Sequence, residues 1–147
     1  QQIVKLRNPY STRPWQHVLE PIGGYLTLAA SLIERPTLHG ESFNFGPPSH
    51  QTQSVLELVQ KMAKYWDQVR WEDTIKDSTD HYESGLLKLN CDKALHYLKW
   101  QASLSFEKTV SLTAQWYKSY YEKPEIISTV TKDQIKEYTK LSNIIFE

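Results

Sequence analysis

Hydrophobic and polar positions follow two periods along this chain, which predicts short strands mixed with longer helices. Alternation at residues 3–6 predicts a strand, and helical spacing over 19–34 predicts a helix that Arg35-Pro36 ends. The same patterns predict strands at 41–46 and 69–71, an apolar piece at 86–89, and helices at 55–66, 94–98, 106–120 and 131–145. We therefore expect an α/β fold of short strands with about five helices.

Side chains at the starts of these helices favour the same boundaries. Ser54 and Glu57 have the spacing of a capping box, in which the serine accepts an amide and the glutamate reaches back. Thr131 and Gln134 form a second such pair at the start of the last predicted helix. Asn90 is placed to cap the helix around 94–98.

The helix predicted at 19–34 carries more apolar residues than one buried stripe needs. The residues expected to form its buried stripe are Ile22, Leu26, Ala29 and Ile33. Leu28 and Leu32, with Leu26, extend the apolar character and predict an exposed surface for another domain. The small pair Gly23-Gly24 predicts that another element packs closely against the helix.

One arginine stands on a stiff turn between the first strand and the first long helix. Proline fixes its own φ and restricts the residue before it, so Arg13-Pro14 restrains the arginine before any ligand binds. A guanidinium can engage two phosphate oxygens at once, so Arg13 is a candidate diphosphate ligand. The alternative is an arginine that pairs with a carboxylate or stacks on Trp15.

The bulk composition excludes several classes of partner. Lys+Arg and Asp+Glu each number 17, so no net charge attracts nucleic acid or an anionic membrane, and an anion site must be local. The single cysteine, Cys91, excludes an internal disulfide and favours a reducing cytoplasm. No apolar run reaches membrane-spanning length, and the histidines lack the spacing of metal ligands.

Residues 7–29, RNPYSTRPWQHVLEPIGGYLTLA, resemble a segment of extended short-chain dehydrogenase/reductases that act on nucleotide sugars. Within that family they are most similar to the dehydratases of CDP-glucose. Residues 41–48, 81–100 and 105–122 resemble later segments of the same family in the same order, so the resemblance covers roughly residues 1–122. Lys99 stands where the family usually has glycine, Tyr82 where it has histidine and Asn90 where it has aspartate.

The resemblance implies a C-terminal substrate-binding lobe over residues 1–124, followed by a helical extension at 125–147. It implies that Arg13 meets the pyrophosphate of CDP-glucose, and that the hexose nucleotide is the partner of this lobe. The residues that it places at the substrate are Arg13, Asn8, Arg7, Phe45, Gly46, His81 and Glu83.

The dinucleotide-binding (Rossmann) half of that family is missing from this sequence. The five glycines do not form a Gly-x-x-Gly-x-x-Gly loop, and no tyrosine has a lysine four residues later. The resemblance implies that the complete enzyme uses NAD to oxidise C4 of the hexose, eliminates water and returns the hydride to C6. We expect this chain alone to bind no NAD and to need the missing domain as its partner, with homo-oligomers as a further expectation. Two alternatives are a non-catalytic interaction module and the same lobe of a nucleotide-sugar epimerase.

Overall fold

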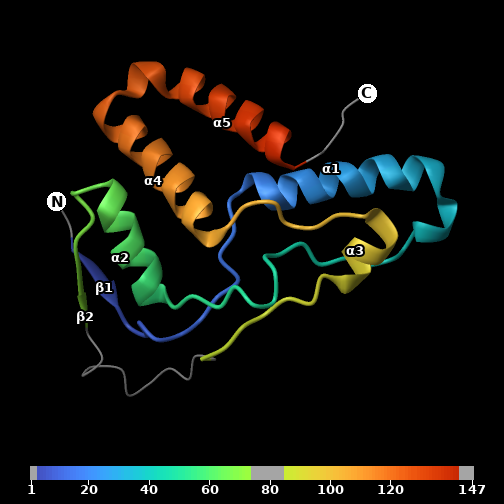
Figure 1. Cartoon of the computed structure of the whole chain (residues 1–147), viewed down its shortest axis with the longest axis horizontal. Coiled ribbons are helices and arrows are strands. Elements are labelled where there is room, and N and C mark those ends of the chain that lie inside the picture. Colours follow the sequence, from blue (N-terminus) through green and yellow to red (C-terminus); the bar gives the residue numbers. More distant parts are fainter. Residues whose placement is uncertain (1–2, 74–84, 143–147) are drawn as a thin grey trace.

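The computed structural model describes residues 3–73 and 85–142 (Figure 1). Within these ranges the chain forms five α-helices and two short strands, which confirms the predicted α/β fold class. The elements in chain order are β1 Val4–Leu6, α1 Leu19–Glu34, the 3₁₀ turn η1 Pro36–Leu38, α2 Val55–Tyr65, β2 Trp71–Asp73, α3 Asp92–Leu98, α4 Phe106–Glu122, the 3₁₀ turn η3 Pro124–Ile126 and α5 Ile127–Leu141.

The two strands lie side by side at one end of the molecule, and the helices occupy the rest (Figure 1). β1 pairs with β2 in parallel, with Val4 opposite Trp71. α4 and α5 form a helical hairpin, α2 packs against α4, and α3 packs against α1. The strand predicted at 69–71 thus exists, but it begins at Trp71.

The predicted capping box at the start of α2 is confirmed. Ser54 Oγ accepts the amide of Glu57 at 3.2 Å, and the Glu57 carboxylate accepts the amide of Ser54 at 2.6 Å, which completes the capping box of α2. The N-cap of α3 is Cys91 and not the predicted Asn90; Asn90, one residue earlier, accepts the amide of Asp92 on its Oδ1 at 2.9 Å.

The predicted buried stripe of α1 is wrong, because the helix turns its small residues inward instead. Ile22, Leu26 and Ile33 are exposed, Ile33 by 86%. Ala29 is exposed as well. The buried side of α1 carries Glu20, Gly23, Gly24 and Ser31. A Cβ on Gly24 would lie 2.3 Å from Cδ1 of Phe45, so only glycine lets that ring pack against the helix. Leu28 and Leu32, predicted as exposed surface, pack partly against the core.

Two further sequence predictions are corrected. Residues 41–46 form no strand; Phe43 and Phe45 are used for core packing instead. The last helix begins at Ile127 rather than at the predicted capping box, because it continues directly from η3. Thr131 is inside the helix, where its hydroxyl donates to the carbonyl of Ile127 and accepts the indole N–H of Trp116, each at 2.8 Å.

The core consists of two hydrophobic clusters. One contains Leu38, Phe45, Ala94, Leu98 and Trp100, with parts of α1 packed against it. The other joins α4 and α5 through Leu104, Leu112 and Tyr138, with Leu19 of α1 against it. α1 therefore contacts both clusters, and the segment that carries Arg13 leads directly into it.

Candidate site around Arg13

Arg13 lies in the segment between β1 and α1, where two neighbouring stretches of chain hold its backbone. Thr12 forms an antiparallel bridge with Ser54 and a parallel bridge with Leu86. The amide of Thr12 donates to the carbonyl of Gly85 at 2.9 Å, and the amide of Trp15 donates back to the carbonyl of Arg13 at 2.9 Å. The predicted turn between the first strand and the first helix is therefore present and tied at both sides.

The side chains next to the turn add to this restraint. Arg13 is half-buried, and its Nη1 donates to the carbonyl of Thr12 at 2.8 Å. The carbonyl of Gln53 accepts two hydrogen bonds from this segment. The Trp15 indole donates to it at 2.9 Å, and the amide of Arg13 donates to it at 3.5 Å. Gln51 Nε2 donates to the carbonyl of Trp15 at 3.1 Å. Trp15 thus links the Arg13 turn to residues 51–53.

Buried acceptors without partners gather around the same turn. In the part of the chain that the structure describes, four buried side-chain polar atoms have no hydrogen-bond partner, and three of them are Ser11 Oγ, Gln16 Oε1 and Gln53 Oε1. The orientation of the Gln16 amide is set by its Nε2, which donates to the carbonyl of Phe45 at 3.0 Å. Because such atoms are rare in folded proteins, their concentration here marks the turn as a candidate functional site.

A cleft begins beside Arg13. Its narrow end has a volume of about 10 Å³ and lies between the Arg13 turn, the Pro47-Pro48 loop and residues 87–89. An adjoining hollow of about 290 Å³ shares Pro47, Pro48, Ser49 and Leu89 with it. The polar side chains that line this hollow are Ser49, His50, Asn90, Asp92 and Gln101. Arg13 therefore lines the small hollow, and the adjoining hollow is lined by several hydrogen-bonding side chains and by the carboxylate of Asp92.

The other predicted substrate residues are only partly brought together. Asn8 is in the turn after β1, where its carbonyl accepts the amide of Ser11 at 3.3 Å, and Arg7 is exposed next to it. Phe45 is buried, with its ring edge-on to Trp100 at a centroid distance of 4.9 Å. Gly46 lines the larger hollow. His81 and Glu83 lie outside the described residues.

Gly46 at the adjoining hollow and Gly24 in α1 are both used for packing. A Cβ on Gly46 would lie 2.8 Å from Cδ1 of Leu89, as one on Gly24 would collide with Phe45. These residues therefore do not form a dinucleotide phosphate loop, in which glycines leave backbone amides open to a ligand. Within the described ranges, no group of three or more His, Cys, Asp or Glu side chains could hold a metal ion.

The sequence reasoning missed a buried carboxylate at the start of α1. Glu20 is only 1% exposed, and it accepts the amides of Ser103 at 2.8 Å and Leu104 at 2.7 Å. Tyr138 donates its hydroxyl to the same carboxylate. Burial raises the pKa of Glu20 although these hydrogen bonds oppose the shift, and burial beside Glu20 raises the pKa of Tyr138. The only signal in the sequence was an acidic residue in the first helical turn.

His17 is also buried, three residues before Glu20. Its Nδ1 accepts the amide of Leu19 at 3.3 Å, so in the neutral ring the proton is on Nε2. Burial lowers the pKa of His17. Gln16, His17 and Val18 line an apolar groove that α1 forms with α4 and α5.

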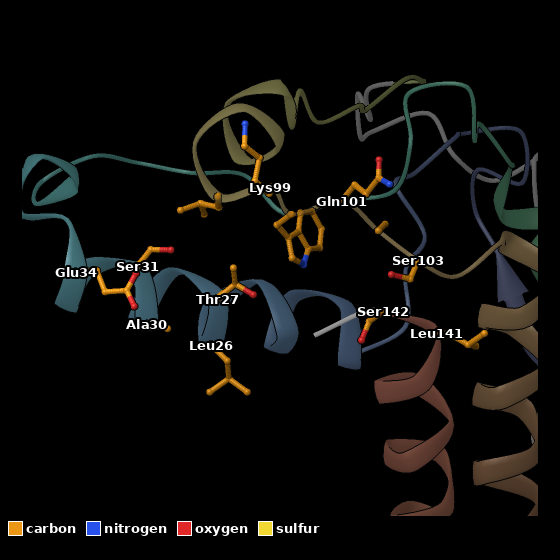
Figure 2. Close-up of a pocket in the computed structure, with 13 residues that line it drawn as sticks. Leu26, Thr27, Ala30, Ser31, Glu34, Lys99, Gln101, Ser103, Leu141 and Ser142 are labelled. Carbon is orange, nitrogen blue, oxygen red and sulfur yellow. The ribbon is translucent and has the colours of Figure 1, made fainter. Parts of the chain in front are cut away.

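Another large hollow lies away from Arg13, at the other end of α1. It has a volume of about 660 Å³, and Figure 2 shows it between α1, the loop with Lys99 and Gln101, and the end of α5 at Leu141 and Ser142. Leu26 of α1 also lines this hollow, although Figure 2 shows its side chain on the side of the helix turned away from that loop. Among the described residues, none of those that the sequence predicts at a substrate lines this hollow. No helix in the described ranges is long and apolar enough to cross a membrane.

Comparisons with known proteins relate the whole chain to one class of enzyme. No family model matches. The chain is 35% identical over 140 residues to CDP-glucose 4,6-dehydratase from Salmonella typhimurium, a match that covers 94% of this chain and 38% of that protein. A crystal structure of dTDP-glucose 4,6-dehydratase from Bacillus anthracis in complex with NAD matches with a TM-score of 0.52 and 16% identity, over 82% of this chain and 36% of that one. That likeness establishes the fold alone.

The chain is therefore similar to the C-terminal part of a nucleotide-sugar 4,6-dehydratase. Within this class it is similar to CDP-glucose 4,6-dehydratase, and it spans less than two fifths of that relative's length. The resemblance that the sequence motifs predict is therefore confirmed.

Proposed function

We propose that this chain is the substrate-binding C-terminal portion of a CDP-glucose 4,6-dehydratase and that Arg13 binds the diphosphate of CDP-glucose. The observation that carries the proposal is the turn of Arg13, which is hydrogen-bonded on both sides and lines a small hollow next to a larger one. It lies within a chain that is 35% identical to such an enzyme. Asn8, Arg7 and the backbone at Phe45 and Gly46 border the same ligand in this proposal, and so do His81 and Glu83.

The physical reason lies in preorganisation. Because the turn already fixes the backbone of Arg13, little conformational entropy is lost when the guanidinium engages two phosphate oxygens. Hydrogen bonds to charged groups contribute about 1.5–3 kcal/mol each, so Arg13 has a large share of the affinity. A single arginine recognises phosphate and not base, so the preference for CDP rests on other contacts.

The chemistry belongs to the remainder of such an enzyme. NAD supplies hydride transfer when it is bound, and in this proposal the remaining portion of the enzyme holds it; the packing roles of Gly24 and Gly46 are consistent with that division. This chain holds and orients the sugar nucleotide, and a dinucleotide-binding portion completes the enzyme. By itself the chain turns over no CDP-glucose, and we place its action in the cytoplasm.

The test is calorimetry with CDP-glucose on the chain combined with the remaining portion of the Salmonella relative. Arg13→Ala should weaken binding by roughly a hundredfold, and Arg13→Lys should recover part of that loss. Arg35→Ala is the matched control, because Arg35 bonds Tyr97 and Ser31 at the far end of α1. If Arg13→Ala leaves the affinity unchanged and lowers the melting temperature, Arg13 is a packing residue and does not bind the diphosphate.

Two further measurements separate the alternatives. Tighter binding of a UDP-sugar than of CDP-glucose would favour an epimerase lobe. Formation of a 4-keto sugar by the purified chain alone, with NAD present, would contradict the claim that it has no catalytic activity.

A further inference from the structure

The groove between α1 and the α4–α5 hairpin is an uncharged surface that nothing in the described chain covers. It has a volume of about 590 Å³ and is lined mainly by apolar atoms. The residues that line it are Gln16, His17, Val18, Leu19, Ile22, Thr113, Trp116, Tyr117, Thr131, Gln134 and Ile135. The only titratable groups among them are His17, which burial favours in its neutral form, and Tyr117.

The apolar surface continues from the groove along α1. Val18, Ile22, Tyr117 and Ile135 in the groove are all exposed by more than two fifths, and Leu26 follows Ile22 one turn further along α1. The core underneath is already complete, because Gly23 and Gly24 pack inward and Tyr138 joins α5 to Glu20. Large exposed apolar patches of this kind mark interaction sites.

We propose that this groove is the docking surface for the dinucleotide-binding portion of the enzyme, a partner that the proposed function requires and on which this inference rests. Two observations identify the occupant. The chain spans 38% of its curated relative and 36% of the NAD-bound dehydratase, so most of each enzyme lies outside the matched part. In addition, the groove starts at Gln16, three residues after Arg13.

The position of the groove fits the chemistry. A hydride passes between two carbon atoms only when they are in contact, so the dinucleotide must come next to the sugar whose diphosphate is on Arg13. A domain that packs against Gln16, Val18 and Ile22 would contact the segment that directly follows Arg13. A domain seated on the larger hollow near Lys99 and Ser142 would contact the opposite half of α1.

The experiment uses this chain with an affinity tag, co-expressed with the remaining portion of the Salmonella dehydratase as a separate polypeptide. The readout is the amount of that portion that remains bound to the captured chain. Ile22→Glu places a charge in the groove and should reduce the retained portion by roughly tenfold or more. Ile126→Glu is the matched control, since Ile126 has a similar exposure, 40% against 44%, and lies at η3, outside the groove.

Retention that Ile22→Glu leaves unchanged would overturn the inference, and so would a wild-type chain that retains nothing. Val18→Glu repeats the test at the most exposed groove position, in case Ile22→Glu lowers the yield of folded chain. A wild-type chain that forms a dimer, which Ile22→Glu converts to a monomer, would assign the groove to a second copy and overturn the proposal. If the complex forms through this groove but binds no CDP-glucose, the docking inference holds and the proposed function fails.

Discussion

Tyr138 in α5 donates a hydrogen bond of 3.0 Å to the carboxylate of Glu20 in α1, which joins two residues 118 positions apart. The same carboxylate accepts the amides of Ser103 and Leu104, so one buried side chain connects three parts of the chain. Buried carboxylates are costly without such donors. The link therefore fixes the start of α1, and with it the end of the segment that carries Arg13.

The first prediction concerns the pH dependence of stability. Because the pKa of Glu20 in the folded chain is raised above its usual 4.5, the ionised form is disfavoured by folding. The stabilisation from this group is therefore complete below pH 4.5 and is lost as pH rises through the raised pKa. Glu20→Gln is uncharged and should remove this loss. Chemical denaturation of both proteins across this pH range measures it.

The measured quantity is the difference in the free energy of unfolding between the wild type and Glu20→Gln, because other carboxyl groups change stability with pH in the opposite direction. Glu57 has a lowered pKa, chiefly through the backbone amide of Ser54, so its contribution is lost as pH falls. Tyr138 adds nothing to the comparison near neutral pH, since its pKa is raised from 10 and it stays protonated. A wild-type minus Glu20→Gln difference that is flat with pH would show that Glu20 is not perturbed.

The second prediction concerns the glycine face of α1. Gly24→Ala should lower the free energy of unfolding by about 1–3 kcal/mol, since its Cβ would lie 2.3 Å from Cδ1 of Phe45 in the core. Gly85→Ala is the control, because a Cβ there meets nothing within 4 Å. We expect that change to be neutral or slightly stabilising. Equal effects of the two substitutions in urea denaturation would contradict this account of the α1 face.

Local signals in the sequence predicted the elements well. Ser54 and Glu57 fix the start of α2 through bonds within four residues, and Arg35-Pro36 ends α1 for reasons within the same two residues. The turn at Arg13 was found for the same reason. At these positions the boundary depends on neighbours along the chain, and the prediction was confirmed.

Features that depend on contacts between distant parts of the chain could not be predicted from local signals. The spacing of apolar residues predicted that Ile22 is buried. Phe45 packs against Gly24 instead, so the face of α1 that carries Ile22 is exposed. Thr131 looked like a helix cap, but Trp116 from α4 bonds its hydroxyl inside the helix. The hollow that adjoins the Arg13 cleft depends on loop positions that no periodicity encodes.

The third prediction concerns Lys99, which ends α3. Lys99 has a left-handed backbone with φ of 57°, which costs a residue with a Cβ roughly 1–2 kcal/mol. Lys99→Gly should therefore raise the free energy of unfolding by about 0.5–1 kcal/mol, after the loss of the exposed bond from Nζ to the carbonyl of His96.

Lys99→Asn should fall between lysine and glycine, because asparagine tolerates the left-handed region better than most residues. Thermal melts of the three proteins give the order. A less stable Lys99→Gly protein would mean that the lysine side chain contributes more through its contacts than its backbone costs.

The last prediction concerns Trp15, whose indole joins the Arg13 turn to the carbonyl of Gln53 at 2.9 Å. Trp15→Phe keeps the aromatic ring and removes this bond. One hydrogen bond contributes about 0.5–1.5 kcal/mol, so we expect the affinity for CDP-glucose to fall by roughly three- to tenfold. The loss arises because the turn no longer holds Arg13 in one position, and calorimetry on the chain combined with its dinucleotide-binding portion measures it.

Two controls separate positioning from general stability. Ser31→Ala removes the bond that its hydroxyl accepts from Arg35 at 2.7 Å, at the far end of α1 and outside the docking groove. It should lower the melting temperature and leave affinity unchanged. In an Arg13→Ala background, Trp15→Phe should cause no further loss of affinity, since its effect passes through the arginine. Additive losses in that double variant would show that Trp15 acts on the ligand by another route.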